Sequence, residues 1–119
     1  MAYFSIIIPV YNRPQEVKEL LGSLAVQTCK DFEVIIVEDG SQERSEQVVT
    51  SYGDLLDVKY FYKENSGPGL SRNYGANCAG GEYLLFLDSD CIVPPEYIAV
   101  IKQACRTKKI DAFGGPDRA

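Results

Sequence analysis

The amino-acid sequence predicts an open α/β fold, with a mostly parallel sheet and helices on both of its faces. Two observations support this prediction. Apolar, strand-like runs alternate with helical patterns along the chain, and charged or polar residues follow the points where these runs stop. The chain has 119 residues, of which 45% are hydrophobic and 24% charged, which is typical of one compact domain. We therefore expect residues 1–119 to form a single domain.

Runs of branched and aromatic residues mark the strands. The first run contains three consecutive isoleucines, and the later ones combine valine, isoleucine, leucine, tyrosine and phenylalanine. The fourth run has four consecutive large apolar side chains, which is typical of a strand buried on both faces. The expected strands are Phe4–Val10, Phe32–Val37, Val58–Tyr62 and Tyr83–Leu87, with Ala112-Phe113 as the start of a fifth.

Apolar residues at helical spacing mark the segments between the strands. In the clearest case Val17, Leu20, Leu21 and Leu24 recur at positions i, i+3, i+4 and i+7 after Pro14, so one face of that helix packs on the sheet. Three further helices are expected: Gln42–Tyr52, Leu70–Ala79 after Gly67-Pro68-Gly69, and one that follows Pro94-Pro95 and buries Ile98, Ile101 and Cys105.

The acidic net charge of the chain argues against nucleic acid as a binding partner. Seventeen acidic residues outnumber 12 basic ones, giving a formal net charge of -5 and a pI of about 4.7, whereas a nucleic-acid-binding domain usually carries a basic patch. No nucleic-acid partner is expected. The sequence also contains no apolar stretch of membrane-spanning length and no secretory signal pattern. We therefore expect a cytoplasmic location. A longer protein that contains this chain could also bind peripherally to the cytoplasmic face of the membrane.

Histidine is absent, and the four cysteines are widely spaced without a Cys-x-x-Cys pair. This composition excludes the usual zinc frameworks, the Ser-His and Cys-His nucleophile systems, and a histidine general base. We expect the cysteines to be buried, reduced thiols.

A carboxylate pair follows the fourth expected strand. Asp88 and Asp90 stand one residue apart, separated by Ser89, where a buried strand ends. Mg²⁺ and Mn²⁺ prefer carboxylate oxygens, and Mg²⁺ is commonly held by one or two carboxylates together with phosphate oxygens and water. The pair is therefore a candidate metal site. The competing interpretation is that both residues only end the strand and cap the next helix.

The other strand ends supply a second group of candidates. A planar ring at Tyr11 and a carboxylate at Asp39 suit a nucleobase, because the ring can stack on the base and the carboxylate can accept an imide N–H such as uracil presents. Arg72, with Ser71 and Asn73, stands near a helix N-terminus, where donors favour a diphosphate. Alternatively, Tyr11 is a rim aromatic, Asp39 a turn residue and Arg72 a solvated helix residue. The same strand ends also carry Pro9, Asn12 and Glu38, which we likewise expect to contact the nucleotide sugar.

Two other nucleotide-binding classes fit less well. A nicotinamide-binding domain needs its glycine fingerprint directly after the first strand, but the residues there are Tyr11-Asn12-Arg13-Pro14. Gly67-x-Gly69 follows the third strand instead, and Arg72 occupies the place of the third glycine. A P-loop nucleoside triphosphatase is excluded because no Gly-Lys-Ser/Thr occurs.

Four ordered segments resemble the motif set of family 2 glycosyltransferases. They are Ser5–Asn12, Phe32–Ser41, Gly69–Gly75 and Gly80–Asp90, and together they extend over nearly the whole chain. The resemblance implies the Rossmann-like, nucleotide-sugar-binding half of a GT-A fold. It also implies Mn²⁺ or Mg²⁺ and inverting transfer of a sugar, most simply from a uridine diphosphate donor, to an acceptor hydroxyl.

Carried over to this sequence, the resemblance assigns roles to individual residues. Pro9 and Tyr11 would border the base, Asp39 would contact uracil, and Arg72 would lie near the base or diphosphate. Asp88 would face the ribose or the metal, Ser89 would lie beside it, and Asp90 would ligate the metal. Glu38 stands where the family's acidic pair begins, next to Asp39.

In the family, the catalytic base and the surface for a sugar or lipid-linked acceptor come from sequence well downstream of the Asp-x-Asp motif. The chain stops soon after that motif, at Ala119. We therefore expect the N-terminal, donor-binding part of a longer enzyme, which is inactive alone and tends to self-associate through an uncovered sheet edge. The alternative is a nucleotide-binding or regulatory module without transfer activity.

Overall fold

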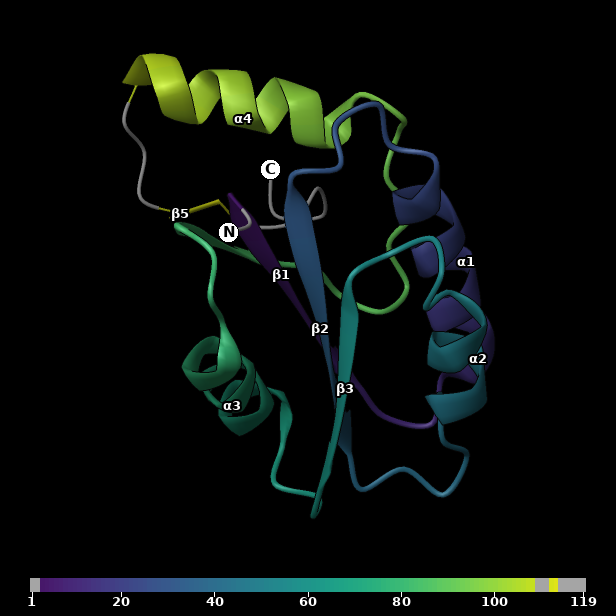
Figure 1. The fold of residues 1–119 in the computed structure, drawn as a ribbon. Helices are drawn as coiled ribbons and strands as arrows, with labels where there is room; N and C mark the ends of the chain where they lie inside the picture. Colours follow the sequence, from purple (N-terminus) through teal and green to yellow (C-terminus); the bar gives the residue numbers. More distant parts are fainter. Residues whose placement is uncertain (1–2, 109–111, 114–119) are drawn as a thin grey trace.

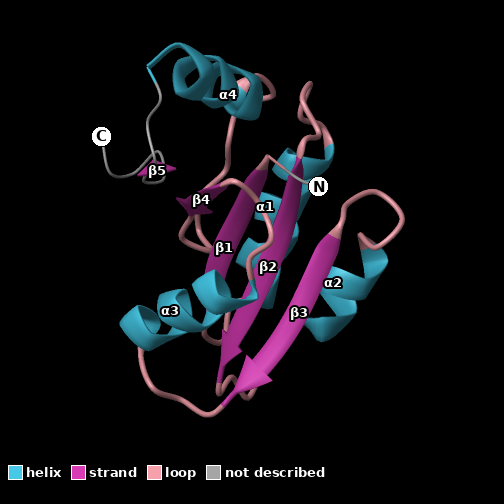
Figure 2. Ribbon diagram, turned by 60° about the vertical axis from the view of Figure 1, so that its left-hand side comes forward, coloured by secondary structure: helices cyan, strands magenta, loops and turns pink. Residues whose placement is uncertain are grey.

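The computed structural model describes residues 3–108 and 112–113, and its strands form one five-stranded sheet in which all the pairings are parallel (Figures 1 and 2). The strand order is β3-β2-β1-β4-β5. The strands are β1 (Phe4–Val10), β2 (Phe32–Asp39), β3 (Val58–Lys63), β4 (Tyr83–Phe86) and β5 (Ala112–Phe113). The chain moves outward from β1 to β3 and then crosses to the other side of β1, so the strand order reverses between β1 and β4. Open α/β sheets bind ligands at the carboxyl ends of their strands beside such a reversal.

The helices form layers on both faces of the sheet. Figure 1 shows α1 (Pro14–Ala25) and α2 (Glu46–Ser51) together on one face and α3 (Pro68–Cys78) on the other. The fourth helix, α4 (Tyr97–Lys108), lies across the end of the sheet where the strands begin. The predicted open, parallel α/β fold with helices on both faces is confirmed.

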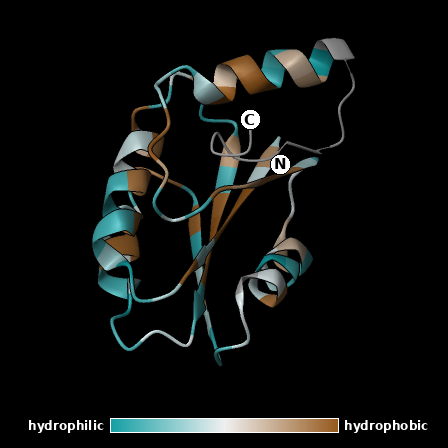
Figure 3. Ribbon diagram, turned by 180° about the vertical axis from the view of Figure 1, so that it is seen from behind, coloured by the Kyte–Doolittle hydropathy of each residue, from teal (hydrophilic) through white to brown (hydrophobic). Residues whose placement is uncertain are grey.

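Strand alternation divides the apolar side chains between two cores. Ile6, Ile8 and Ile36 face α1, whereas Ile7 and Ile35 face α3. The α1 side holds the larger core, which α4 completes through Ile98, Ile101 and Cys105. Figure 3 shows the strongly apolar strands between more polar helices. A strand buried on both faces gives a continuous apolar run, which explains why β1 and β2 are so hydrophobic.

Gly75 brings α3 close to the sheet. A Cβ atom at this position would lie 2.5 Å from Ile7 Cγ2 and 3.3 Å from Val37 Cγ2, which is too close for the first pair. The α3 side of the sheet therefore has a thin core, and the N-terminal turn of α3 lies directly over the carboxyl ends of β1 and β2.

Several element boundaries differ by one to four residues from the sequence prediction, and hydrogen bonds explain the start of α2 and the end of β2. α2 begins at Glu46 rather than Gln42, because the N–H groups of the preceding residues bond to the side chains of Asn12 and Glu38 instead of entering a helix. β2 extends to Asp39 rather than Val37, because β3 continues to pair with it as far as Lys63. In both cases tertiary hydrogen bonds decided the boundary.

The four cysteines are free thiols, but only Cys91 and Cys105 are buried, and Cys29 and Cys78 are half-buried. The expectation of four buried thiols was therefore right for two of them. Within residues 3–108 and 112–113, every helix is too short or too polar to cross a lipid bilayer.

Candidate functional site

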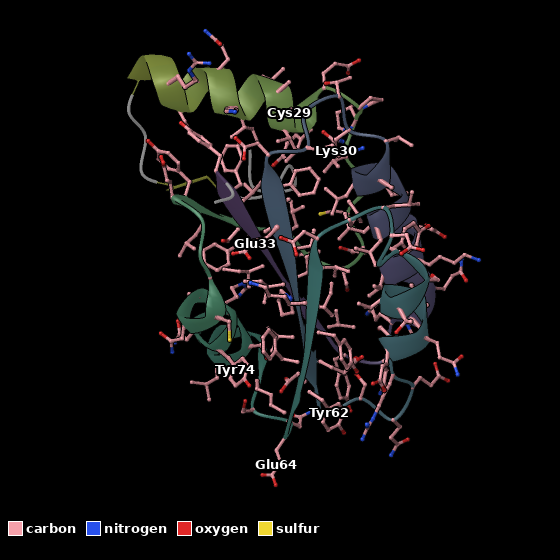
Figure 4. The ribbon with its side chains drawn as sticks, viewed as in Figure 1. Cys29, Lys30, Glu33, Tyr62, Glu64 and Tyr74 are labelled. Carbon is pink, nitrogen blue, oxygen red and sulfur yellow. The ribbon has the colours of Figure 1, made fainter. Side chains whose placement is uncertain are left out.

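A cavity of about 280 Å³ opens at the carboxyl ends of β1, β2 and β4, beneath the first turn of α3. The label of Glu64 in Figure 4 marks the end of the sheet at which this cavity lies. Eight of the eleven residues that the sequence singled out line it, and Asn12, Glu38 and Asn73 do not. The lining residues are Pro9, Val10, Tyr11, Arg13, Asp39, Ser71, Arg72, Asp88, Ser89 and Asp90.

Asp39 is a buried carboxylate held from three directions. Its Oδ1 accepts hydrogen bonds from Lys63 Nζ at 2.6 Å and from the Ser66 N–H at 2.8 Å, and its Oδ2 accepts one from the Gly67 N–H at 2.9 Å. Burial acts to raise the pKa of this carboxyl, but the ammonium and the two N–H groups more than offset it, so the pKa lies below its ordinary value. Asp39 is therefore ionised and fixed in orientation.

Glu38, the neighbour of Asp39, points to the opposite face of the sheet and does not line the cavity. It is fully buried. Its Oε1 accepts hydrogen bonds from the Ser45 N–H at 2.7 Å and the Tyr60 hydroxyl at 3.0 Å, and its Oε2 accepts one from the Ser41 hydroxyl. Burial and the hydrogen bond to Glu38 raise the pKa of Tyr60. The contacts of Glu38 hold the turn between β2 and α2.

Asn12 also lies outside the cavity lining and joins two turns. It has a positive φ of 53°, a conformation that asparagine tolerates better than most residues. Its N–H donates to Ser41 Oγ at 2.7 Å, and its Oδ1 accepts from the Gln42 and Glu43 N–H groups at 2.7 and 3.0 Å. These contacts fix the turn that presents Tyr11, whose ring is half exposed at the cavity.

Arg72 and Asp88 meet across the cavity from different elements. Arg72 Nη2 in α3 lies 3.5 Å from Asp88 Oδ1 after β4, and both side chains are partly exposed. Asp90 is exposed on the same rim. Among the described residues no group of three Asp, Glu, Cys or His side chains is arranged to hold a metal ion. Asp88 and Asp90 nevertheless supply two carboxylates, a donor set that suits Mg²⁺ or Mn²⁺ when phosphate oxygens and water complete the coordination.

The loop that follows Asp90 is anchored to α1. Gln27, which is buried, donates from Nε2 to the Pro94 carbonyl at 2.6 Å and accepts from the Ile98 N–H at 3.0 Å. The Ser23 hydroxyl accepts a longer bond of 3.3 Å from the Val93 N–H. These contacts join the Asp-x-Asp loop to the larger core and so fix one wall of the cavity.

Three residues with a place at the site were not predicted. Val10 and Arg13 flank Tyr11 in sequence, so their position in the lining follows from the turn. Lys63 does not line the cavity but holds Asp39. Lys63 and Asp39 are paired because of the register between β3 and β2, and the sequence alone did not predict that register.

Comparisons with known proteins identify the family to which the chain belongs. The family model for glycosyl transferase family 2 matches residues 5–118, so the chain belongs to this family. An uncharacterised glycosyltransferase of Rickettsia typhi is 45% identical over 94 residues, which cover 79% of this chain and 29% of that protein. Validoxylamine A glucosyltransferase of Streptomyces hygroscopicus is 39% identical, over 84% of this chain and 25% of that protein. The chain thus spans less than a third of these relatives.

Solved structures of S. aureus TarS, residues 1–349, share the fold, as expected for the GT-A class. The complex with UDP aligns with a TM-score of 0.83 and 37% identity over 90% of this chain and 32% of that one. The complex with UDP-GlcNAc gives a TM-score of 0.84 at the same identity and coverage.

Proposed function

We propose that this chain is the donor-binding part of a glycosyltransferase that moves a sugar from a uridine diphosphate sugar to an acceptor hydroxyl, with inversion and with the help of Mn²⁺ or Mg²⁺. The observation that carries the proposal is the cavity at the strand ends. It gathers an exposed aromatic ring, a fixed carboxylate, a guanidinium and two further aspartates in a chain of glycosyl transferase family 2. The UDP and UDP-GlcNAc complexes of TarS support the choice of donor.

The base would lie between Tyr11 and Asp39. A carboxylate has about four acceptor positions on its two oxygens. The contacts of Asp39 with Lys63, Ser66 and Gly67 use three of them, with a single bond on Oδ2. One acceptor position therefore remains for the imide N–H of uracil, while the half-exposed ring of Tyr11 provides a face for stacking.

The diphosphate would lie near Arg72, Asp88 and Asp90. With Mn²⁺ or Mg²⁺ bound, the metal would neutralise the negative charge that develops on the diphosphate. Asp90, with Asp88, would hold the metal, and Ser89 is placed between them in the cavity lining. The guanidinium of Arg72 already balances Asp88 at 3.5 Å and provides donors for a phosphate oxygen.

The transfer step also needs a base and an acceptor surface. We assign no residue of this chain to the base, because Asp39 and Glu38 are held by other groups and the two remaining carboxylates of the cavity are assigned to the metal. We propose that the base and the acceptor surface come from sequence that follows Ala119 in the whole enzyme.

Calorimetric titration of the 119-residue chain tests the proposal. We expect UDP to bind more tightly than GDP or ADP, more tightly with Mn²⁺ or Mg²⁺ than with a chelator, and Asp90→Asn to remove most of the gain from metal. Asp54→Asn is a matched control, because Asp54 is exposed and lies outside the cavity lining. Equal UDP affinity with metal and with chelator would contradict the proposed role of Asp90.

A further inference from the structure

Two buried hydroxyl groups among the described residues lack a hydrogen-bond partner, and only one of them lies at the cavity. The groups are Ser45 Oγ and Ser71 Oγ, and both residues are fully buried. Ser71 lines the cavity, whereas Ser45 does not. A buried polar group without a partner costs free energy, and most such groups in folded proteins are paired. A ligand in the cavity would supply the partner that Ser71 lacks.

The position of Ser71 in α3 places it near Asp39. It lies one helical turn before Gly75, the residue at which α3 approaches Ile7 and Val37. Ser71 therefore lies on the same sheet-facing side of α3 as Gly75, in the first turn of the helix, close to the carboxyl ends of the strands. Side chains alternate along β2, so Asp39 is on the same face of the sheet as Val37. The N–H of Ser71 is already bonded to the Gly67 carbonyl at 3.1 Å, which leaves the hydroxyl as its free donor.

The two side chains differ in what they offer a ligand. Asp39 is ionised and only accepts hydrogen bonds, whereas the hydroxyl of Ser71 can also donate one. The imide N–H of uracil lies between two carbonyl groups, so a base whose N–H meets Asp39 presents a carbonyl oxygen on either side.

We propose that Ser71 is a specificity-determining residue of the nucleotide site, whose hydroxyl donates to a carbonyl oxygen of the base beside the N–H that Asp39 accepts. This assignment rests on the proposed function. The ligand supplies an acceptor to the orphaned hydroxyl, and the hydroxyl in turn favours a base with a carbonyl next to its N–H. A base that leaves the hydroxyl unpaired would bind more weakly.

Ser71→Ala tests the assignment through binding and stability together. Removing the hydroxyl should weaken UDP binding about tenfold, which is typical of one lost hydrogen bond. The thermal midpoint of the unliganded chain should stay the same or rise, because alanine favours the helix and no partner loses its bond. Ser45→Ala is the matched control: it removes the other unpartnered hydroxyl and should leave UDP affinity unchanged.

Sulfur-substituted ligands identify the contact itself. The 2-thio and 4-thio analogues of UDP replace each base carbonyl by a poorer acceptor, so the unmodified chain should discriminate against one of them. Ser71→Ala should abolish that discrimination, and Ser45→Ala should retain it.

The outcomes separate this assignment from the proposed function. If the unmodified chain binds UDP and Ser71→Ala binds it equally well, the assignment of Ser71 is wrong and the proposed function stands. Equal weakening for UDP and both analogues, accompanied by a lower thermal midpoint, would show a structural role and also overturn the assignment. Absence of UDP binding by the unmodified chain would overturn both.

Discussion

The two ends of β2 carry the same arrangement of charges, but of the two only the carboxyl end lines the cavity described above. Glu33 at the start of the strand and Asp39 at its end are both buried carboxylates on the side that faces α3. Each pairs with a lysine of β3, Lys59 with Glu33 and Lys63 with Asp39. A loop that flanks α3 also donates backbone hydrogen bonds to each carboxylate, one to Glu33 and two to Asp39.

At the amino end the arrangement fixes the loop between α3 and β4. Glu33, labelled within the sheet in Figure 4, accepts hydrogen bonds from Lys59 Nζ at 2.9 Å, the Ser5 hydroxyl at 2.5 Å and the Gly80 N–H at 2.7 Å. Ser5 Oγ in turn accepts from the Gly81 N–H at 2.8 Å. Burial acts to raise the pKa of Glu33, but these donors lower it below its ordinary value.

At the carboxyl end the same chemistry fixes the loop between β3 and α3 and leaves a cavity beside it. The first turn of α3 and the loop after β4 line this cavity together with the strand ends, at the edge where open parallel sheets bind ligands beside a reversal of strand order. Similar hydrogen bonding therefore fixes a loop at Glu33 and presents a carboxylate to the cavity at Asp39, where we propose that it binds the base. The position of a carboxylate along the strand, rather than its local chemistry, determines which role it has.

Glu33→Ala should have the largest effect, and it should be an effect on stability. The change leaves the Gly80 N–H and the Ser5 hydroxyl without a buried acceptor, which typically costs about 2–4 kcal/mol in total. Urea unfolding measures the loss. UDP affinity under conditions where the variant is folded should stay unchanged, because Glu33 lies outside the cavity lining. Retention of the wild-type urea midpoint would show that the loop does not depend on Glu33.

Asp39→Asn should have the next largest effect, and it should be an effect on binding. The amide replaces a charged acceptor by a neutral one and cannot accept from all three donors, so UDP affinity should fall about 10- to 100-fold. Glu33→Gln makes the matching change at the other end of β2. It should lower the urea midpoint and leave the Kd for UDP unchanged. If the two variants weakened UDP binding equally, the distinction between the two ends would be wrong.

Lys63→Met should have the smallest effect, visible mainly in the pH dependence of binding. Lys63 helps to keep the pKa of Asp39 low, so carboxylate-dependent binding persists above that pKa and is lost as pH falls through it. Without Lys63 the pKa of Asp39 rises, and UDP affinity should begin to fall at a higher pH on acidification. Titrations with UDP at several pH values would compare the affinity of Lys63→Met with that of the control variant Lys59→Met. Lys59 is half exposed and pairs with Glu33, so its removal should leave the profile in place. Identical profiles for Lys63→Met and the unmodified chain would contradict the role of Lys63.

The sequence predicted the elements best where one physical signal dominated. The isoleucine run predicted β1 correctly because both faces of that strand are buried. The i, i+3, i+4, i+7 pattern predicted α1 correctly because its four apolar residues pack into one core. The start of α2 was wrong because Asn12 and Glu38 hold the preceding N–H groups. The sequence pattern of α2 does not indicate that Asn12 and Glu38, which are distant in sequence, accept these hydrogen bonds.

For the site, the sequence by itself determined which residue types gather at the strand ends, because carboxylates and an aromatic ring directly follow apolar strands whose carboxyl ends meet at one edge. Only the tertiary structure decided that Asp39 faces the cavity while Glu38 faces the other side, and that Lys63 fixes Asp39 as Lys59 fixes Glu33. The physical reason is that side-chain direction and cross-strand pairing depend on the register of β2 with β3, and a shift of one residue would exchange the two faces.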